Sequence, residues 1–480
     1  MRFQKRIFGW LITGAILGLA PTALAGELDP PAGAVAPTMK DLDDVSPRQI
    51  IRNDFDTLTP IVISSPGSYY LGEEILAFFD NHGIEITASN VTLDLNGFSV
   101  IGNTEVGSFD GIHVTGQRTN ITIRNGRVVA FVLDGIDFGT AENMIVSDVT
   151  VAFCGGDGIN SGNSALVERC VVDNSGGDGI DTGIASVVRD CVVTASGDIG
   201  IRADTSTVIT GCVSRSNSIG ISTGVTSVVS DCNAASNTGF GISVSFNCQV
   251  NDCIAEGNGG VGFTSNSTAF FKDCVAQNNG SHGFDAGGAS GSKLTGCFAA
   301  SNGGNGIDAG SNTHISGCTV RSNTLAGIDG TNDITVVDTV VLSSMGGAGI
   351  DLSSGNVERC TVRNSAASGI TISSSGDVRD CIVENNEGDG IFGGFDTSVV
   401  GCTAYSNGLA GIHINGQRGF IDSNRCRANA RGIDVDQTNN TIIRNVSIQN
   451  GTAFDIVVGN DAAPIQVSPV GAGPYDNLAH

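Results

Sequence analysis

The sequence predicts an all-β solenoid in which each turn takes about 21 residues. The first observation is a repeated phrase, because VVRDCVVTASGDIGIR at Val187–Arg202 returns as VITGCVSRSNSIGIS at Val208–Ser222. The second is the composition, since 68 Gly, 10 Pro and 5% aromatic residues suit short strands and many turns. The third is a cysteine that recurs at one position of the repeat: Cys170, Cys191, Cys212, Cys232, Cys253, Cys274, Cys297, Cys318, Cys360, Cys381 and Cys402. One period over most of the chain indicates one elongated unit.

The alternation of residue types within a repeat predicts which side chains point inward. The cysteine and the residue two positions later are apolar with period two, so both should lie inside. The residue before the cysteine is usually Asp or Gly, as at Asp190 and Gly211, which suits a turn. The fifth residue after the cysteine is always Ser or Asn, and such a column can hydrogen-bond along the stack. A recurring Gly-Ile pair should form an interior wall, with the next residue facing solvent.

Fourteen cysteines in an exported chain would normally suggest disulfides. Residues one repeat apart, however, stack about 4.8 Å apart with parallel side chains. A disulfide prefers Cβ atoms about 3.8 Å apart and turned toward each other. The spacing therefore favours a column of buried thiols over a column of disulfides.

These repeats resemble those of the right-handed parallel β-helix proteins of the pectate-lyase-like superfamily, over about Asn90 to Ile456. The resemblance implies a right-handed parallel β-helix with three short strands per turn and a packed, dry interior. It implies no specific enzyme family. The segment HGFDAG at His282–Gly287 shares only Gly-Phe-Asp with the motif of alginate epimerases, and the Tyr and His that their chemistry needs are missing.

Five segments are expected: a signal peptide at 1–25, a Pro-rich linker at 26–46, an N-terminal cap with the first strands at 47–89, the parallel β-helix at 90–460 and a tail at 461–480. Arg2, Lys5 and Arg6 precede an apolar run and an A-x-A site ending at Ala25, which is typical of a secretory signal. Export to the periplasm or the exterior is therefore expected, without a membrane span. A short helix is expected to begin near Ser46-Pro47.

The formal charge of −25 limits the partners. Removal of Arg2, Lys5 and Arg6 with the signal peptide would change it to −25 − 3 = −28. So acidic a surface repels nucleic acid and anionic membranes. It would also repel an acidic polysaccharide unless a divalent cation lay between them. A polysaccharide or a cell-surface glycan is the expected partner, and the sequence does not indicate an oligomeric state.

Aspartates recur on neighbouring turns, both after the Gly-Ile pair and before its glycine. Carboxylates about 5 Å apart repel one another unless a cation lies between them, and Ca²⁺ binds several such oxygens. The first candidate metal site comprises Asp134, Asp137, Asp157, Asp178 and Asp181, together with Asn160. A secondary acidic column comprises Asp285, Asp308, Asp329 and Asp351. The alternative is that these are solvated turn residues that bind nothing.

A third candidate lies near the C-terminus. His413 and Asp434 should share the outward column on neighbouring turns, and Arg431 is close in sequence. Together they suggest an anion subsite, and the alternative is a solvated basic turn. Arg202 lies one repeat after Asp181 in the outward column of the first candidate metal site. It is expected to pair with an acid on a neighbouring turn.

Two functions follow from these observations. The first is an exported scaffold that binds glycans or cations through one face. The second is a polysaccharide-active enzyme, meaning a lyase, hydrolase or epimerase on polyuronides, which the fold supports only by analogy. An open groove lined by the first acidic cluster and Arg202 would favour the enzyme.

Overall fold

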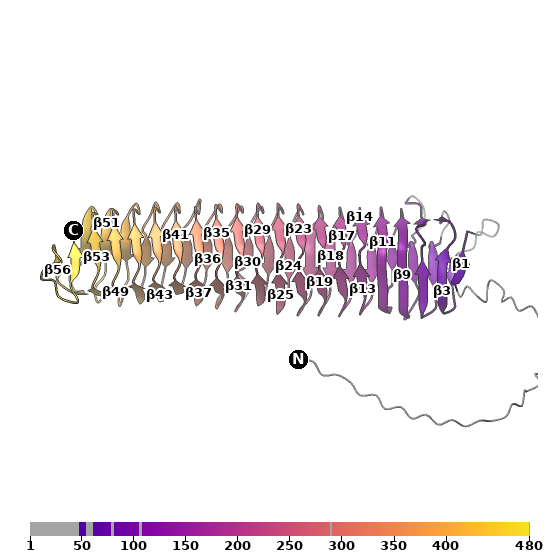
Figure 1. Ribbon diagram of the computed structural model, residues 1–480, viewed down its shortest axis with the longest axis horizontal. Coiled ribbons are helices and arrows are strands. Elements are labelled where there is room, and N and C mark those ends of the chain that lie inside the picture. Colours follow the sequence, from indigo (N-terminus) through magenta and orange to yellow (C-terminus); the bar gives the residue numbers. More distant parts are fainter. Residues whose placement is uncertain (1–47, 54–60, 78–80, 105–107, 289, 480) are drawn as a thin grey trace, which may run out of the picture. The chain divides into compact units, whose positions relative to one another are not determined.

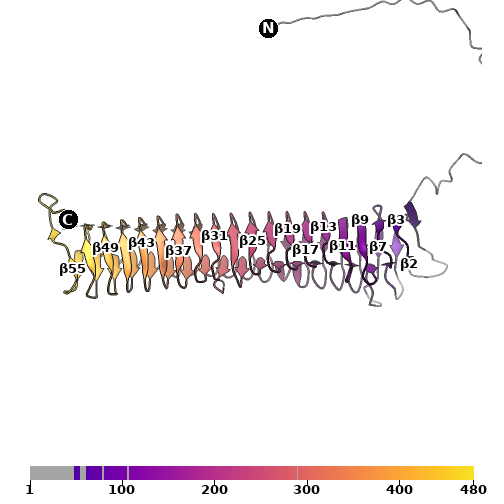
Figure 2. The same cartoon turned by 90° about the horizontal axis from the view of Figure 1, so that it is seen from below.

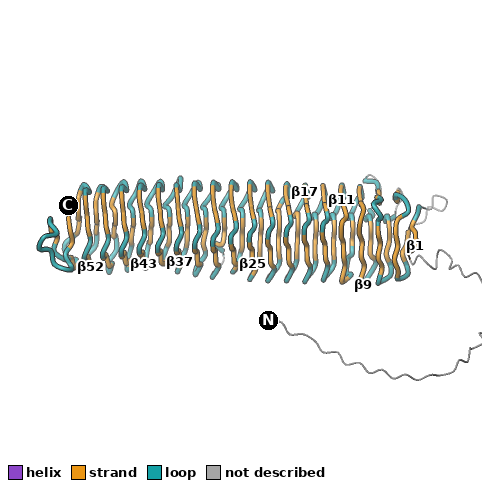
Figure 3. Tube along the Cα trace, viewed as in Figure 1, coloured by secondary structure: helices purple, strands orange, loops and turns teal. Residues whose placement is uncertain are grey.

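The computed structural model describes residues 48–53, 61–77, 81–104, 108–288 and 290–479. The predicted signal peptide and linker lie outside these residues. All the secondary structure in the described part consists of β-strands, and every strand pairing is parallel. Each turn alternates short strands with loops (Figure 3). Among the described residues no helix offers a long apolar stretch that would cross a membrane.

The strands form a right-handed parallel β-helix with three faces, and equivalent strands of successive turns lie side by side (Figures 1 and 2). The Gly-Ile face consists of the strands that start at or near the Ile of the recurring Gly-Ile pair. In spatial order they are β2 (Ile61–Ile63), β5 (Ile84–Ile86), β8 (Ile112–Val114), β10 (Ile136–Asp137), β12 (Ile159–Ser161), β15 (Ile180–Thr182), β18 (Ile199–Ala203), β21 (Ile219–Thr223), β24 (Ile242–Val244), β27 (Phe263–Ser265), β30 (Phe284–Ala286), β33 (Ile307–Ala309), β36 (Ile328–Gly330), β39 (Ile350–Leu352), β42 (Ile370–Ile372), β45 (Ile391–Gly393), β48 (Ala410–Ile414), β51 (Arg431–Val435) and β54 (Thr452–Ile456).

The other two faces hold the strands just before and just after the cysteine position. The pre-Cys face runs from β1 (Arg48–Ile51) to β55 (Asp461–Ala462), and the post-Cys face runs from β4 (Ile75–Leu76) to β57 (Asn477–Ala479). Two long strands, β9 (Thr119–Val129) and β11 (Glu142–Ala152), continue from one of these faces into the other, with the corner at Asn125 and Asp148, whose φ values are 59° and 56°. Near the C-terminus β56 (Ile465–Gln466) pairs with β57.

The helix predicted to begin near Ser46-Pro47 is wrong for the residues that follow. Arg48–Ile51 is strand β1, which pairs in register with β3 (Gly67–Leu71), so that Ile51 lies opposite Leu71. The side chain of Ile51 is buried with the rest of the core. Pairing with β3 satisfies the backbone groups and buries this Ile, and the tertiary contact therefore overrides the local helix signal.

The interior is apolar and closely packed. Ile112, Ile136, Ile159 and Ile180 lie in register on successive turns and are fully buried. Larger rings fill the middle of the β-helix, where Phe263 and Phe284 stack with centroids 4.9 Å apart. The predicted interior wall is confirmed.

The corners explain the Asp, Gly, Ser and Asn columns. Asp190 and Gly211, each directly before a cysteine, have φ of 54° and 65°, a left-handed conformation that Gly and Asp adopt readily. At the next corner, buried asparagines form a ladder in which each side-chain Nδ2 donates to Oδ1 on the following turn at 2.9–3.0 Å. This unbroken part comprises Asn237, Asn258, Asn279, Asn302 and Asn323. The hydrogen bonds of the ladder replace the hydrogen bonds to water that these amides lose on burial.

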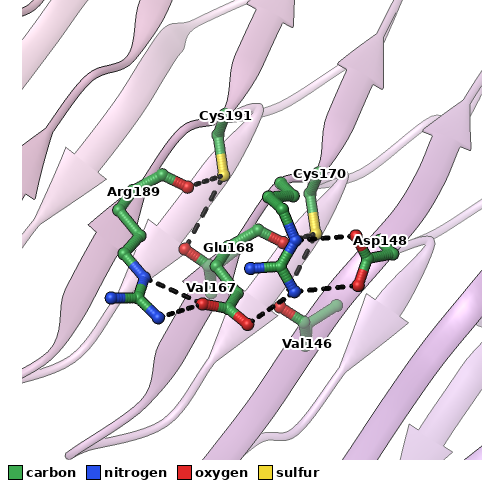
Figure 4. Close-up of polar contacts among 8 residues, drawn as sticks. Val146, Asp148, Val167, Glu168, Cys170, Arg189 and Cys191 are labelled. Atoms are coloured by element: carbon green, nitrogen blue, oxygen red, sulfur yellow. Dashed lines mark hydrogen bonds and ion pairs between the residues drawn. The ribbon is translucent and has the colours of Figure 1, made fainter.

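All fourteen cysteines are buried and unpaired by disulfides, as the spacing predicts. Cys170 and Cys191 direct their Sγ atoms at carbonyl oxygens 3.6 Å away on the preceding turn, those of Val146 and Val167 (Figure 4). Beside them, Arg169 binds the exposed carboxylate of Asp148, and Arg189 binds the buried carboxylate of Glu168 (Figure 4). The thiols thus act as small apolar residues with a weak donor.

Candidate functional site

Two columns of side chains face outward on the Gly-Ile face. The central column is the residue directly after the Ile, and the pre-Gly column is the residue directly before the glycine. The central column begins with Glu85, His113, Asp137, Asn160, Asp181 and Arg202, which pair in register from β5 to β18. The pre-Gly column beside it contains His82, Asp110, Asp134, Asp157 and Asp178. Charged groups therefore lie side by side in two columns over this stretch.

The pre-Gly aspartates have a structural task as well. Oδ1 of Asp110 accepts a hydrogen bond from the backbone N–H of Asp134 at 2.9 Å, and Oδ1 of Asp134 accepts from Asp157 at 2.7 Å. The same contact links Asp157 to the N–H of Asp178. A Cβ on Gly177 would lie 2.3 Å from Oδ1 of Asp157, so glycine is required at this turn. The Gly-Gly-Asp sequence therefore makes room for a carboxylate that caps the next turn.

Three of the predicted metal ligands come together. One carboxylate oxygen from each of Asp157, Asp178 and Asp181 lies within 4.8 Å of the others. Arg202 donates from Nη1 to Oδ2 of Asp178 at 3.1 Å, so the expected pairing of this arginine with a neighbouring acid is confirmed. Since Oδ1 of Asp178 accepts the N–H of Ile199, both of its oxygens are engaged.

Burial, with repulsion between neighbouring carboxylates, raises the pKa of Asp134, Asp157 and Asp181 to about 6 in each case. Burial opposes ionisation of Asp137 too, but contacts with His113 and the N–H of Gly139 hold the pKa of Asp137 below its ordinary value. The predicted set of five thus divides. Asp137 contacts the imidazole of His113, whereas Asp157, Asp178 and Asp181 form the acidic group, called the aspartate cluster below.

The sequence interpretation missed two residues of this face, His82 and His113. Their rings stack with centroids 4.2 Å apart and an interplanar angle of 9°. Nδ1 of His113 lies 3.0 Å from Oδ2 of both Asp110 and Asp137. Contact with Asp110, then with Asp137, raises the pKa of His113 to about 10, whereas burial lowers the pKa of His82. The signal for His113 was present in the sequence, because it directly follows the Gly-Ile pair at Ile112.

A groove opens along the C-terminal ends of these strands. It has a volume of about 720 Å³ and extends over the ends of β12, β15, β18 and β21. Asn160, Asp181 and Arg202 of the central column line it, and Glu142, Asn163 and Asp204 add polar groups from the adjoining turns. The aspartate cluster therefore borders an open, polar channel that runs across several turns.

The secondary acidic column is in register but differs in its surroundings. Asp285, Asp308, Asp329 and Asp351 follow one another on β30, β33, β36 and β39. The pre-Gly residues beside them are His282, Asn305, Ala326 and Ala348, none of which is acidic. Burial raises the pKa of Asp308 and Asp351. None of the three clusters with converging metal-type ligands in the described residues includes a member of this column.

At the C-terminal end, the structure pairs the charges of the predicted anion subsite with each other. His413 lies next to Asp434 in register, and Arg431 binds the Asp434 carboxylate. Nδ1 and Nε2 of His413 lie 3.1 Å from carboxylate oxygens of Asp389 and Asp436. The contact with Asp389 raises the pKa of His413 to about 9 despite burial. With each cation already bound to a carboxylate, this corner offers little to an external anion.

Comparison with known proteins gives a family assignment by sequence. A model described as the right handed beta helix region matches residues 134–270 and 260–393, which together exceed half of the chain. No curated protein matches the sequence.

Three solved structures illustrate the similarity by fold. The mannuronan C-5 epimerase AlgE4 A-module of Azotobacter vinelandii is 14% identical, with 86% of this chain and 91% of that chain covered and a TM-score of 0.25. A tailspike protein of Escherichia coli bacteriophage HK620 is 13% identical, with coverage of 71% and 74% and a TM-score of 0.30. The pectate lyase Pel9A is 14% identical, with coverage of 59% and 68% and a TM-score of 0.24. Similarity at this level does not extend to substrate or activity.

Proposed function

Since the chain belongs to the right-handed β-helix family, we propose that it is an exported protein that binds a polysaccharide along the Gly-Ile face. The groove beside Asn160, Asp181 and Arg202 is the observation that carries this proposal. It is open along its length and lined by amide, carboxylate and guanidinium groups, which suit the many hydroxyls of a sugar chain. The signal-type sequence at residues 1–25 supports export.

The negative charge of the protein supports a role for a cation in binding an acidic polysaccharide. The chain carries a formal charge of −25, so an acidic sugar could approach the groove only if positive charge were added. We propose that the aspartate cluster binds Ca²⁺, whose hard, flexible coordination sphere accepts several carboxylate oxygens. The ion would lie at the margin of the groove, since Asp181 belongs to both. A bound uronate would then contact both the ion and Arg202.

A second candidate function is catalysis on a polyuronide. Two observations favour it: the groove that Asp181 and Arg202 line, and the carboxyls of Asp134, Asp157 and Asp181 on one face, each with a pKa of about 6. A carboxyl that remains partly protonated near neutral pH can act as a general acid, and a neighbouring ionised carboxylate can act as a base. Arg202 would position the substrate carboxylate or neutralise charge on it.

Calorimetric titration tests the proposal. Oligomers of pectate and alginate and a neutral glucan would be titrated into the protein, with and without Ca²⁺. We expect the acidic oligomers to bind only with Ca²⁺, and Arg202→Gln or Asp181→Asn to weaken this binding at least tenfold. Asp329→Asn, in the secondary column, is the matched control and should bind as the unchanged protein does.

Analysis of the products in the same mixtures tests the second function, which is catalysis. New unsaturated chain ends, new reducing ends or a change in the ratio of epimers would identify a lyase, a hydrolase or an epimerase. Loss of product in Asp157→Asn, with binding retained, would assign catalysis to this face. If no oligomer binds under any condition, the polysaccharide proposal is wrong.

A further inference from the structure

Imidazoles and carboxylates converge at the N-terminal end of the Gly-Ile face, on the turns before the aspartate cluster. His113 is the middle residue of β8, and Asp137 lies beside it in register on β10. His82 and Asp110 precede the glycines that lead into β5 and β8. One ligand atom from each of His82, Asp110 and His113 lies within 4.8 Å of the other two.

The contacts within this group leave one nitrogen without a regular partner. Oδ2 of Asp110 and Oδ2 of Asp137 both lie 3.0 Å from Nδ1 of His113. This nitrogen is buried, yet no described residue makes a hydrogen bond of normal geometry with it. A ring nitrogen carries at most one hydrogen, so it cannot donate properly to two carboxylates at once. A cation shared by the nitrogen and the two oxygens would satisfy all three.

We propose that His113, Asp110, Asp137 and His82 form a binding site for a divalent transition-metal ion of the Zn²⁺ type. Zn²⁺ binds imidazole nitrogen and carboxylate oxygen at about 2.0–2.2 Å, usually with four ligands in a tetrahedron. Ligand atoms at such distances lie about 3.4 Å apart. The pairs observed here are 3.0, 3.0 and 3.4 Å apart, the last being Nδ1 of His82 and Oδ2 of Asp110. Small adjustments would therefore accommodate the ion.

The four ligands are not equivalent. Nδ1 of His82 also accepts the backbone N–H of Asp110 at 3.1 Å, so His82 can bind the ion only if this contact yields. His82 is thus the weakest ligand, and His113, Asp110 and Asp137 form the main set. Glu85 is the neighbour of His113 in the central column, and its Oε1 accepts a hydrogen bond from the hydroxyl of Thr115 at 2.6 Å.

The carboxylates are held in position by their other oxygens. Oδ1 of Asp110 accepts the N–H of Asp134, and Oδ1 of Asp137 accepts the N–H of Gly139 at 2.8 Å and Nδ2 of Asn160 at 3.2 Å. In both residues Oδ2 remains for the ion. Such secondary contacts orient ligands and strengthen metal binding.

The donor set separates this site from the proposed Ca²⁺ site. Imidazole nitrogen favours Zn²⁺ and related ions, whereas the aspartate cluster offers oxygen alone, which Ca²⁺ prefers. The metal site does not depend on the proposed function, because neither His113 nor Asp110 lines the groove. Failure to bind a polysaccharide would leave it intact.

The test uses the full chain after removal of metals with EDTA. Zn²⁺ would be titrated by calorimetry, and Co²⁺ would be followed by visible absorption, which reports a four-coordinate site directly. We expect one tight equivalent of Zn²⁺, an intense Co²⁺ spectrum and a rise in Tm with Zn²⁺. Asp110→Asn keeps the Oδ1 contact with Asp134 and replaces only the oxygen that faces the ion. It should fold normally and weaken Zn²⁺ binding at least tenfold.

Two further variants complete the design. His113→Ala should abolish the Co²⁺ spectrum, whereas His82→Ala should weaken binding less. His314→Ala is the matched control, since His314 lies outside the three clusters of converging metal-type ligands in the described residues. The proposal is overturned if the unchanged protein binds no Zn²⁺. It is equally overturned if Asp110→Asn and His113→Ala, with normal circular dichroism, bind Zn²⁺ as tightly as His314→Ala does.

Discussion

The two acidic stretches lie on the same Gly-Ile face, with the same register and a repeated aspartate, yet they are built differently. From β8 to β15 the pre-Gly column is acidic on every turn, Asp137 and Asp181 add carboxylates to the central column, and a groove runs beside the later of these turns. From β30 to β39 only the central column is acidic. Residues of one column are about 4.8 Å apart, which is too far for close sharing of an ion by many ligands. The second column of acids supplies the missing ligands.

The two stretches also differ in the residues at their interior corners. Behind β30, β33 and β36 the corner residues are Asn279, Asn302 and Asn323, which belong to the continuous amide ladder. Behind β15 and β18 they are Ser175 and Ser196, whose buried hydroxyls have no hydrogen-bond partner among the described residues. Ser344, at the corner before β39, likewise has no hydrogen-bond partner among the described residues, so the amide ladder covers three of the four turns of the secondary column.

The largest expected effect is on stability. Asn302→Ala removes the side-chain contacts to Ala276 and Asn323. It also removes the oxygen that accepts hydrogen bonds from the backbone N–H and Nδ2 of Asn279. A cost of about 2–3 kcal/mol is expected, because buried polar groups lose their partners. Ser196→Ala removes a hydroxyl that has no partner, and its effect should stay within about 0.5 kcal/mol. Hydrogen exchange of the amides in each turn measures both, and equal costs would contradict the contrast.

The next effect is on cation affinity. Asp178→Asn and Asp181→Asn should each weaken Ca²⁺ binding about tenfold, or about 1.4 kcal/mol, because each removes charge from the aspartate cluster. Asp308→Asn and Asp329→Asn should change it less than twofold. Calorimetric titration of Ca²⁺ into the metal-free protein compares the four variants. A loss of the same size in both stretches would show that one column of acids is sufficient.

A smaller effect concerns pH. Burial raises the pKa of Asp157 from 3.8 to about 6, and Asp134, Asp178 and Arg202 surround it. Between these values the folded chain binds more protons than the unfolded chain, so stability falls as pH rises from about 4 to 6. Asp157→Asn retains the acceptor for the N–H of Asp178 and should flatten this dependence by about 2–4 °C in Tm. Thermal unfolding in EDTA measures it, and an unchanged pH profile would refute the assignment.

The smallest effect is a gain of function. Ala326 and Ala348 precede Asp329 and Asp351 by three residues, as Asp178 precedes Asp181. Replacing Ala326→Asp and Ala348→Asp should therefore create a weak additional Ca²⁺ site in the secondary column. An extra equivalent in the titration, absent from the single variants, is the expected result. No extra equivalent would show that the groove, and not the second column, makes the first stretch different.

Much of the architecture could be predicted because every turn of a solenoid buries the same kinds of residue at the same positions of the repeat. The alternation around Cys191 fixed which residues are buried, and the Ser and Asn column was readable as a corner. The outward position of Asp137, Asp181 and the secondary column also followed from the Gly-Ile pair. The first strand was missed since Arg48–Ile51 lacks a repeat to compare with and is held by pairing with β3.

The outward position of His113 was readable from the Gly-Ile pair, but its contact with His82 could not be predicted, for a physical reason. Ile84 and Ile112 are paired neighbours but lie 28 residues apart, so an insertion breaks the period where His82 and His113 meet. The contact between them depends on ring orientation, and periodicity carries no information on that. The distances from His113 to two carboxylates likewise depend on how side chains of two consecutive turns are oriented.

The column of buried thiols can report how many turns of the β-helix remain folded. While a turn remains stacked, its cysteine is shielded from solvent, as Cys170 and Cys402 are. Each turn contacts only its neighbours, so disassembly from either end would expose the sulfur atoms one after another. The number of thiols that react with an alkylating reagent under load or mild denaturant would then count the turns that have peeled away. Intact molecules would remain unlabelled, and the position of the last modified cysteine would mark the boundary of the folded part.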